Sequence, residues 1–369
     1  MNLRSIAAAL LAVALGSQPV GAAEAEPLPA VCIDENAVSV SGISSGAFFA
    51  HQFHVAHSAR VMGAAIFAGG PYLCAGDNFP QSLFRSLSVC SHFSPGPFRG
   101  PPEPQRSVTA ARGAAAAGGI DDVSGLRGDR VFLFSGRLDT FVPVSVVEAV
   151  QSFYRAFDVA GDISFERDID AAHAMVTKNF GNQCDTSEAP HLNACGYDLA
   201  GAALAHIYGS LDSATSADGK LLAFTQTEFV KAGERHGLAG SGYAYVPEAC
   251  MRGRRCRLHV AFHGCQQNAD TVGDAFTGGA GYNEWAEANR IVVLYPQAAA
   301  LADRVAGVRL DWPNPRGCWD WWGFTGADFA RKSGPQISAV DSMIDRLAGK
   351  TGIVGSSAAG GSCAQADGE

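Results

Sequence analysis

A strand that runs into a glycine-flanked serine turn, followed at once by a helix, constrains this chain more than any other feature of its sequence. Residues 38–41 form a short apolar run, the next five read GISSG, and 47–59 have a helical pattern. A sharp turn of this kind lifts a serine hydroxyl above the edge of a sheet, and glycines on both sides let the backbone pass closely. The G-x-S-x-G pattern therefore predicts a nucleophile at Ser44, with Ser45 as the alternative.

Short apolar runs and longer amphipathic runs alternate along the rest of the chain. The expected strands are 61–68, 130–135, 163–167, 243–246, 258–262 and 291–295, and the expected helices are 106–117, 144–157, 275–288 and 339–348. Such alternation is typical of a mainly parallel sheet with helices on both faces. No repeat or linker interrupts it, so we expect one α/β domain of α/β-hydrolase type over residues 26–350.

The first 25 residues have the order of a secretory signal peptide. A single arginine precedes an apolar run too short to span a bilayer, and small residues follow it. We expect cleavage near residues 22–25 and export to the periplasm or the medium. No later stretch is apolar enough for a membrane span, and the small-residue segment 351–369 is expected to be a loose tail.

Ten cysteines are consistent with export. An even number of cysteines in an oxidising compartment favours disulfides, although one sequence does not give their connectivity. The close pairs Cys184/Cys195 and Cys250/Cys256 are candidates to close short loops. A zinc site is the alternative, but the sequence contains no CxxC and no Cys–His cluster with ligand spacing.

The formal net charge of −9 and the lack of a Lys/Arg run argue against a nucleic-acid partner. His51, His54 and His57 are three residues apart on the expected helix and resemble a metal-binding trio. Their side chains point in successively different directions around the helix, and no acidic residue lies at ligand spacing from them, so packing or surface roles are favoured. We expect no metal, no cofactor, no membrane association and a monomer.

An acid and a base follow the serine in the chain order that α/β-hydrolases use, Ser then Asp then His. Asp139 comes just after the strand 130–135, and His173 follows the strand 163–167. Carboxyl ends of parallel strands meet at one edge of a sheet, so we predict a Ser44–His173–Asp139 triad. A loop acid and a surface histidine are the alternatives, and Asp168 and Asp170 lie too near His173 for the usual layout.

The expected oxyanion hole has an unusual position in the chain. Its first donor should be the N–H of Ser45, and the second ordinarily comes from a loop that precedes the nucleophile. Here the strand 258–262 runs into HGC far downstream of Ser44, which makes Cys265 the candidate for the second N–H. Circular permutation explains this order, because domain termini often lie close together. The alternative is a turn with Cys265 in a disulfide, which is compatible with the same role.

Taken together, these motifs resemble the secreted poly(3-hydroxybutyrate) depolymerases whose catalytic domain is a circularly permuted α/β-hydrolase. The resemblance spans about residues 37–347 and rests on VSGISSGAFFAHQ, FSGRLDTFVP, AAHAM, CGYDLAGAALAHIYG, CRLHVAFHGCQQ, YPQA and CWDWWGFTG. It implies a serine esterase that cleaves short-chain hydroxyalkanoate esters. It also implies Ser44, Asp139 and His173 as the catalytic residues, with the amides of Ser45 and Cys265 as the oxyanion hole.

The tryptophans of CWDWWGF are candidates to bind the polyester or oligoester substrate, namely Trp321, Trp322 and Trp319. Core packing is the alternative for each of them. Many polymer-degrading relatives carry a linker and a separate substrate-binding domain, which we do not recognise in this sequence, so oligomers and other polyesters remain candidates. The rival functions are a feruloyl or acetyl-xylan esterase, whose order is usually unpermuted, and a noncatalytic polymer-binding protein.

Overall fold

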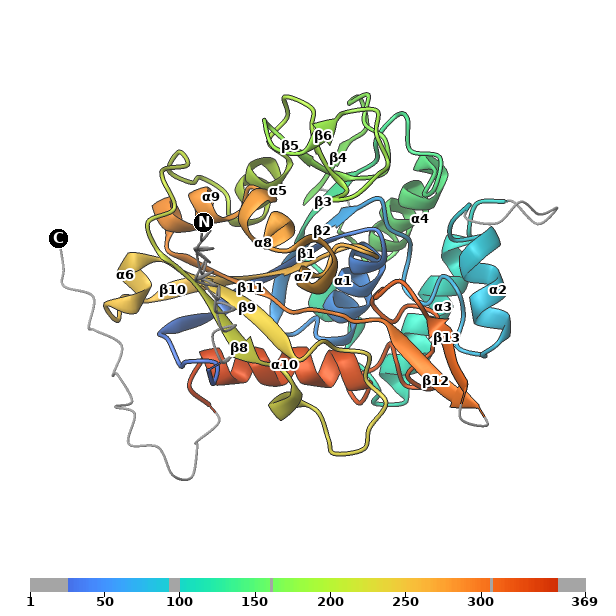
Figure 1. Ribbon diagram of the computed structural model, residues 1–369. Coiled ribbons are helices and arrows are strands. Elements are labelled where there is room, and N and C mark those ends of the chain that lie inside the picture. The colour runs from blue at the N-terminus through green and yellow to red at the C-terminus, as the bar shows by residue number, and fades with distance from the viewer. Residues whose placement is uncertain (1–25, 93–99, 160–161, 306–307, 351–369) are drawn as a thin grey trace, which may run out of the picture.

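The computed structural model describes residues 26–92, 100–159, 162–305 and 308–350 (Figure 1). The expected signal peptide, 1–25, and the expected tail, 351–369, lie outside the described residues. An eight-stranded sheet has the order β4-β3-β2-β1-β10-β11-β9-β8. Its strands are β1 (Ile33–Ile43), β2 (Val61–Phe67), β3 (Arg130–Phe134), β4 (Ile163–Glu166), β8 (Lys220–Thr225), β9 (Ser241–Val246), β10 (Cys256–Phe262) and β11 (Ile291–Tyr295).

Six neighbouring strands of this sheet, from β4 to β11, run parallel. β9 pairs antiparallel with β11, and β8 pairs antiparallel with β9. The central strands read as nearly continuous apolar runs, such as IVVLY in β11, which is buried throughout, and VMGAAIF in β2, which is buried except at Met62. Runs of this kind are expected where helices cover both faces of a parallel sheet. The predicted α/β fold is confirmed.

Strands from the two ends of the sequence lie side by side in the sheet. β10 pairs with β1, with Val40 opposite Val260 and Gly42 opposite Phe262. The segment that carries HGC thus lies next to the strand that carries GISSG, although more than 200 residues separate them. This is the neighbourhood that the expected circular permutation requires.

Helices cover both faces of the sheet. They are α1 (Ser45–Ala56), α2 (Gln81–Ser88), α3 (Pro104–Ala116), α4 (Val144–Arg155), α5 (Leu199–Tyr208), α6 (Glu248–Met251), α7 (Ala269–Val272), α8 (Ala275–Gly279), α9 (Asn283–Asn289) and α10 (Pro335–Leu347), with short 3-10 turns η1 (Val123–Leu126) and η3 (Thr227–Phe229). α1 packs over β1, β2 and β10, while α5 packs on β2 and β3 and α9 on β11. Figure 1 shows α5 and α9 above the sheet and α10 below it.

The single helix expected over 275–288 is wrong, because the chain forms α8 and α9 with a break between them. The sequence GGAG, residues 278–281, ends α8 and enters the break, and Gly281 has φ 88°, a left-handed conformation that glycine adopts without steric cost. Glycine also weakens a helix interior.

Two small sheets lie outside the main one. Strands β5 (Met175–Thr177), β7 (Leu192–Ala194) and β6 (Asn182–Gln183) pair in that order, and β12 (Leu301–Val305) pairs with β13 (Val308–Asn314). The three-stranded sheet follows directly after His173, so it gives the histidine loop an ordered support.

Four disulfides join described cysteines: Cys74–Cys90, Cys184–Cys195, Cys250–Cys256 and Cys265–Cys318. The two short-loop pairs predicted from spacing are therefore confirmed. The Cys265–Cys318 disulfide instead joins two segments that are 53 residues apart, the HGC loop and the CWDWW segment.

The three histidines of α1 are buried and have different partners. His51 Nδ1 lies 3.1 Å from the carbonyl oxygen of Gly70, and His54 lies between the Tyr154 hydroxyl and the Asp129 carboxylate. Within the described ranges, no group of three or more His, Cys, Asp or Glu side chains is placed to hold a metal ion. No helix in these ranges has the length and apolar character needed to cross a bilayer.

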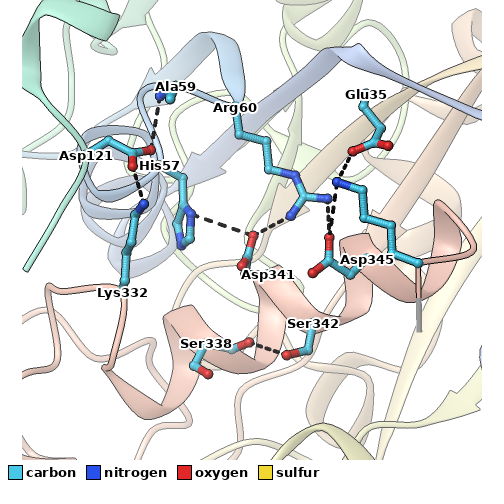
Figure 2. Close-up of polar contacts among 11 residues, drawn as sticks. Glu35, His57, Ala59, Arg60, Asp121, Lys332, Ser338, Asp341, Ser342 and Asp345 are labelled. Atoms are coloured by element: carbon cyan, nitrogen blue, oxygen red, sulfur yellow. Dashed lines mark hydrogen bonds and ion pairs between the residues drawn. The ribbon is translucent and has the colours of Figure 1, made fainter. Parts of the chain in front are cut away.

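A cluster of charged residues joins the end of α1 to α10 (Figure 2). The Arg60 guanidinium donates to Asp341 at 2.6 Å and to Asp345 at 2.7 Å, and its side chain is only 16% exposed. Lys332 pairs with Asp121 in the same cluster. These contacts attach the last described helix to the centre of the fold.

Arg60→Gln should lower the free energy of unfolding by about 1–3 kcal/mol, because it leaves two half-buried carboxylates without their shared partner. Urea unfolding at neutral pH measures this change. The matched control is Arg252→Gln, since Arg252 is 62% exposed and, among the described residues, its ion pair is with Glu248, four residues earlier. Its expected cost is at most about 0.5 kcal/mol. Equal losses in the two variants would contradict a structural role for the cluster.

Candidate active site

Ser44 occupies a strained turn between β1 and α1. Its backbone has φ 56° and ψ −124°, a region that residues with a side chain rarely adopt. A Cβ placed on Gly42 would lie 2.2 Å from the carbonyl oxygen of Gly46, and a Cβ on Gly46 would lie 2.3 Å from that of Phe262. Both glycines of the motif are therefore required by close backbone approach.

The structure brings Ser44, His173 and Asp139 together. Ser44 Oγ lies 2.9 Å from His173 Nε2, and His173 Nδ1 lies 2.7 Å from Asp139 Oδ2. The other carboxylate oxygen accepts the backbone N–H groups of Phe141 and Val142, both at 2.9 Å. An Asp139 carboxylate that accepts from Nδ1–H leaves Nε2 free to accept the serine proton, which is the arrangement of a nucleophile, a base and an orienting acid.

The surroundings hold this histidine in place. The Ser187 hydroxyl accepts the backbone N–H of His173 at 3.2 Å, and the Phe141 ring lies 5.5 Å from the imidazole. The N–H of Ala172 donates to the carbonyl of Cys184, whose disulfide closes the supporting three-stranded sheet. The alternative acids Asp168 and Asp170 are exposed, and Asp170 pairs with Arg137.

The two amides expected to form an oxyanion hole flank the serine. Ser45 is the first residue of α1, and Cys265 follows Gly264, at which an added Cβ would lie 3.3 Å from Ser44 Cβ. Neither N–H donates a hydrogen bond to another described residue. Helix N-termini and free amides of this kind stabilise negative charge on a substrate oxygen.

Gln267 joins the HGC loop to the histidine loop. Its Oε1 accepts the N–H of Gly264 at 2.7 Å, and its Nε2 donates to the carbonyl of His191 at 2.7 Å. Sequence reasoning did not single out Gln267, His191 or Ser187. The second glutamine of the quoted HGCQQ motif was the available signal for Gln267, whereas the sequence around Ser187 and His191 has no distinguishing pattern.

A crevice of about 430 Å³ opens over the serine. Its walls are mostly apolar and include Phe48, Leu83, Leu87, Phe141, Val142, Pro313, Trp321 and Trp322. Trp321 stacks on Phe48 with ring centroids 4.0 Å apart. The indole Nε1–H groups of Trp321 and Trp322 have no hydrogen-bond partner among the described residues.

Trp319 does not lie at the crevice. It is fully buried and stacks on Phe49, with ring centroids 4.7 Å apart, and it also contacts Phe262. The expected role of Trp319 in substrate binding is therefore wrong. The segment turns at Asp320, which directs Trp319 into the core. The buried Asp320 carboxylate accepts the N–H groups of four residues that follow it, 322–325. Burial raises the pKa of Asp320, and these hydrogen bonds oppose the rise.

No protein-family model matches the chain. Its sequence is 40% identical to the poly(3-hydroxybutyrate) depolymerase of Delftia acidovorans over 359 residues, which are 95% of this chain and 68% of that protein. It is 34% identical to the polyhydroxybutyrate depolymerase of Talaromyces funiculosus over 347 residues, 91% of this chain and 95% of that protein. The chain belongs to the polyhydroxybutyrate depolymerase family.

Solved structures of depolymerases share this fold. One is a PHB depolymerase with a serine replaced by alanine, complexed with an R3HB trimer, and it matches with a TM-score of 0.77 and 32% identity over 88% of this chain and 99% of that chain. The PHB depolymerase from Penicillium funiculosum matches with the same TM-score, 33% identity and the same coverage. The sequence motifs indicated a resemblance to polyhydroxybutyrate depolymerases, and these comparisons confirm it.

Proposed function

We propose that this chain is a serine esterase that hydrolyses poly(3-hydroxybutyrate) and its oligomers through an acyl-enzyme on Ser44. The observation that carries the proposal is the Ser44–His173–Asp139 chain of hydrogen bonds at the floor of an apolar crevice. The family relationship supports the choice of substrate, since both curated relatives are named depolymerases of this polyester.

The reaction proceeds by acylation and deacylation. His173 Nε2 takes the Ser44 proton as Oγ attacks the ester carbonyl, and the carbonyl oxygen becomes negative opposite the N–H groups of Ser45 and Cys265. His173 then returns the proton to the leaving 3-hydroxyl group. A water molecule, deprotonated by the same histidine, attacks the acyl-enzyme and releases the acid. Asp139 stabilises the imidazolium that forms in both steps.

The crevice suits a short-chain polyester. Its apolar walls, which include Trp321 and Trp322, match the methyl and methylene groups of a hydroxybutyrate unit. We assign these two tryptophans to substrate binding. The bound R3HB trimer in a related depolymerase supports the same substrate chemistry.

Apolar side chains beside the crevice favour contact with the solid polymer. Phe79, Phe84 and Leu87 are 40%, 58% and 37% exposed, and α2, which carries the last two, lines the crevice through Leu83 and Leu87. Exposed apolar patches of this kind mark interaction surfaces. They support insoluble polymer as a substrate.

We further propose that residues 26–350 form one exported, monomeric catalytic domain. The eight-stranded sheet takes strands from both halves of the sequence, and residues of a single chain supply every group of the candidate site. Four disulfides among described cysteines are typical of a protein that folds outside the cytoplasm.

The test is the release of 3-hydroxybutyrate and short oligomers from polymer film and from soluble trimer, combined with diisopropyl fluorophosphate labelling. The wild type should clear the film, and the reagent should abolish activity and label the peptide that contains Ser44. Hydrolysis of the trimer without any effect on film would reject the polymer as substrate. Full activity after labelling, or a label on another serine, would reject the assigned nucleophile.

A further inference from the structure

The crevice is apolar over most of its wall, but one charged side chain lines it. Arg316 is exposed at the crevice, two residues before Cys318. No ion pair joins it to an acidic side chain in the part of the chain that the structure describes. An arginine without an acidic partner in a substrate crevice is available to bind an anion, because its guanidinium is always charged and presents several donors.

The backbone of Arg316 is held close to the reacting centre. Its carbonyl oxygen accepts the N–H of Gln266 at 2.8 Å, and the Cys265–Cys318 disulfide joins the same two loops. Cys265 and Gln266 directly follow Gly264, at which an added Cβ would lie 3.3 Å from Ser44 Cβ. Arg316 therefore extends from a loop attached to the oxyanion hole.

His191 lies in the same crevice as this arginine. His191 lines the crevice, and its pKa is lowered chiefly by burial and further by the nearby charges of His173 and Arg316. His173 donates a proton to the leaving group during acylation, so the leaving group must pass beside it. His173, His191 and Arg316 line the same crevice, so a leaving segment that extends along this crevice from His173 can meet Arg316.

The chemistry of the substrate then determines what Arg316 meets. Cleavage of a hydroxyalkanoate ester divides the chain into an acyl half, which carries the hydroxyl terminus, and a leaving half, which carries the carboxylate terminus. A free carboxylate of an intact oligomer is consequently always on the leaving side.

We propose that Arg316 forms a carboxylate subsite on the leaving-group side, which binds the terminal carboxylate of hydroxyalkanoate oligomers and favours cleavage near that end. The proposal rests on the esterase function proposed above. Since Arg316 is exposed, solvent and salt weaken the pair, and we expect an effect of about five- to tenfold on KM. A neutral polymer segment inside a film gains nothing from this subsite.

The test compares the soluble 3-hydroxybutyrate trimer as free acid with the same trimer as methyl ester. The wild type should have a kcat/KM about five- to tenfold higher for the acid, and added salt should reduce the preference. Arg316→Gln should remove the preference by raising KM for the acid alone, whereas Arg316→Lys should retain part of it. Arg252→Gln, far along the chain on an exposed helix, should behave as the wild type.

Hydrolysis of p-nitrophenyl butyrate, which has no carboxylate, provides the check on folding and chemistry and should be equal in all variants. An unchanged acid-to-ester ratio in Arg316→Gln overturns the subsite while the esterase function stands. An equal loss on both trimers and on p-nitrophenyl butyrate overturns it too, because Arg316 would then be structural. If the wild type cleaves none of these esters, the proposed esterase function is rejected, and the proposed subsite is rejected with it.

Discussion

Replacing Ser44 by alanine is expected to lower kcat on the soluble trimer by about 10⁶-fold, because no other group near His173 Nε2 can form the acyl-enzyme. The variant should keep its fold. Alanine is smaller than serine, and the Ser44 side chain makes its one observed hydrogen bond to His173. Released 3-hydroxybutyrate measures the activity, and circular dichroism with urea unfolding measures the fold.

The neighbouring Ser45 offers a matched control. Its hydroxyl accepts the N–H of Trp319 at 3.4 Å, and only its backbone N–H is assigned to the reaction. Ser45→Ala keeps that N–H, so the expected loss of kcat is at most about tenfold, the effect of losing one hydrogen bond. An inactive Ser45→Ala beside an active Ser44→Ala would transfer the nucleophile to Ser45.

The free energy of unfolding is expected to fall by about 4 kcal/mol per pH unit between pH 5.5 and pH 4.5. Three fully buried histidines account for this fall, to which His57 adds because burial lowers its pKa too, while the raised pKa of Asp320 opposes it. Burial lowers the pKa of His51 and His259 from 6.5 to about 3, and lowers that of His263 to about 4. Below pH 6.5 the unfolded chain binds three protons that the folded chain does not, so acid favours unfolding, and each proton contributes about 1.4 kcal/mol per pH unit.

The hydrogen bonds of two of these histidines explain why they stay neutral. His259 lies between the hydroxyls of Ser39 and Ser41, both at 2.7 Å, beneath the serine turn. His263 Nε2 accepts the N–H of Ala298 at 3.0 Å, while Nδ1 faces the carbonyl of Gly264. Protonation of Nε2 would remove that acceptor in a site without water access.

Urea unfolding over this pH range tests the prediction, and His51→Phe assigns its source. His51 Nε2 has no hydrogen-bond partner among the described residues, so phenylalanine loses the bond to Gly70 and no other that the structure shows there. The slope should fall by about 1.4 kcal/mol per pH unit in this variant. Phe153→Leu, at a ring packed against His51, should lower stability at every pH with the slope unchanged. A slope equal to that of the wild type in His51→Phe would contradict the assignment.

Features that depend on local backbone geometry and on periodicity could be predicted from the order of the residues alone. Buried parallel strands need continuous apolar runs, so β2, β3, β10 and β11 were predictable. The serine turn needs glycines at 42 and 46, because backbone carbonyls lie where their side chains would be. Disulfides that close short loops are also local, and Cys184–Cys195 and Cys250–Cys256 followed from their spacing.

Features that depend on contacts between distant segments were established by the folded structure alone. Such contacts produce no periodic pattern in the sequence. The contacts of Ser187, His191 and Gln267, and the pairing of Cys265 with Cys318, are examples. The orientation of neighbouring tryptophans also depends on such contacts. Trp319 faces the core and Trp321 the crevice because the chain turns around the buried Asp320. The place of Cys265 beside Ser44 likewise depends on the pairing of β10 with β1, which residue spacing alone does not specify.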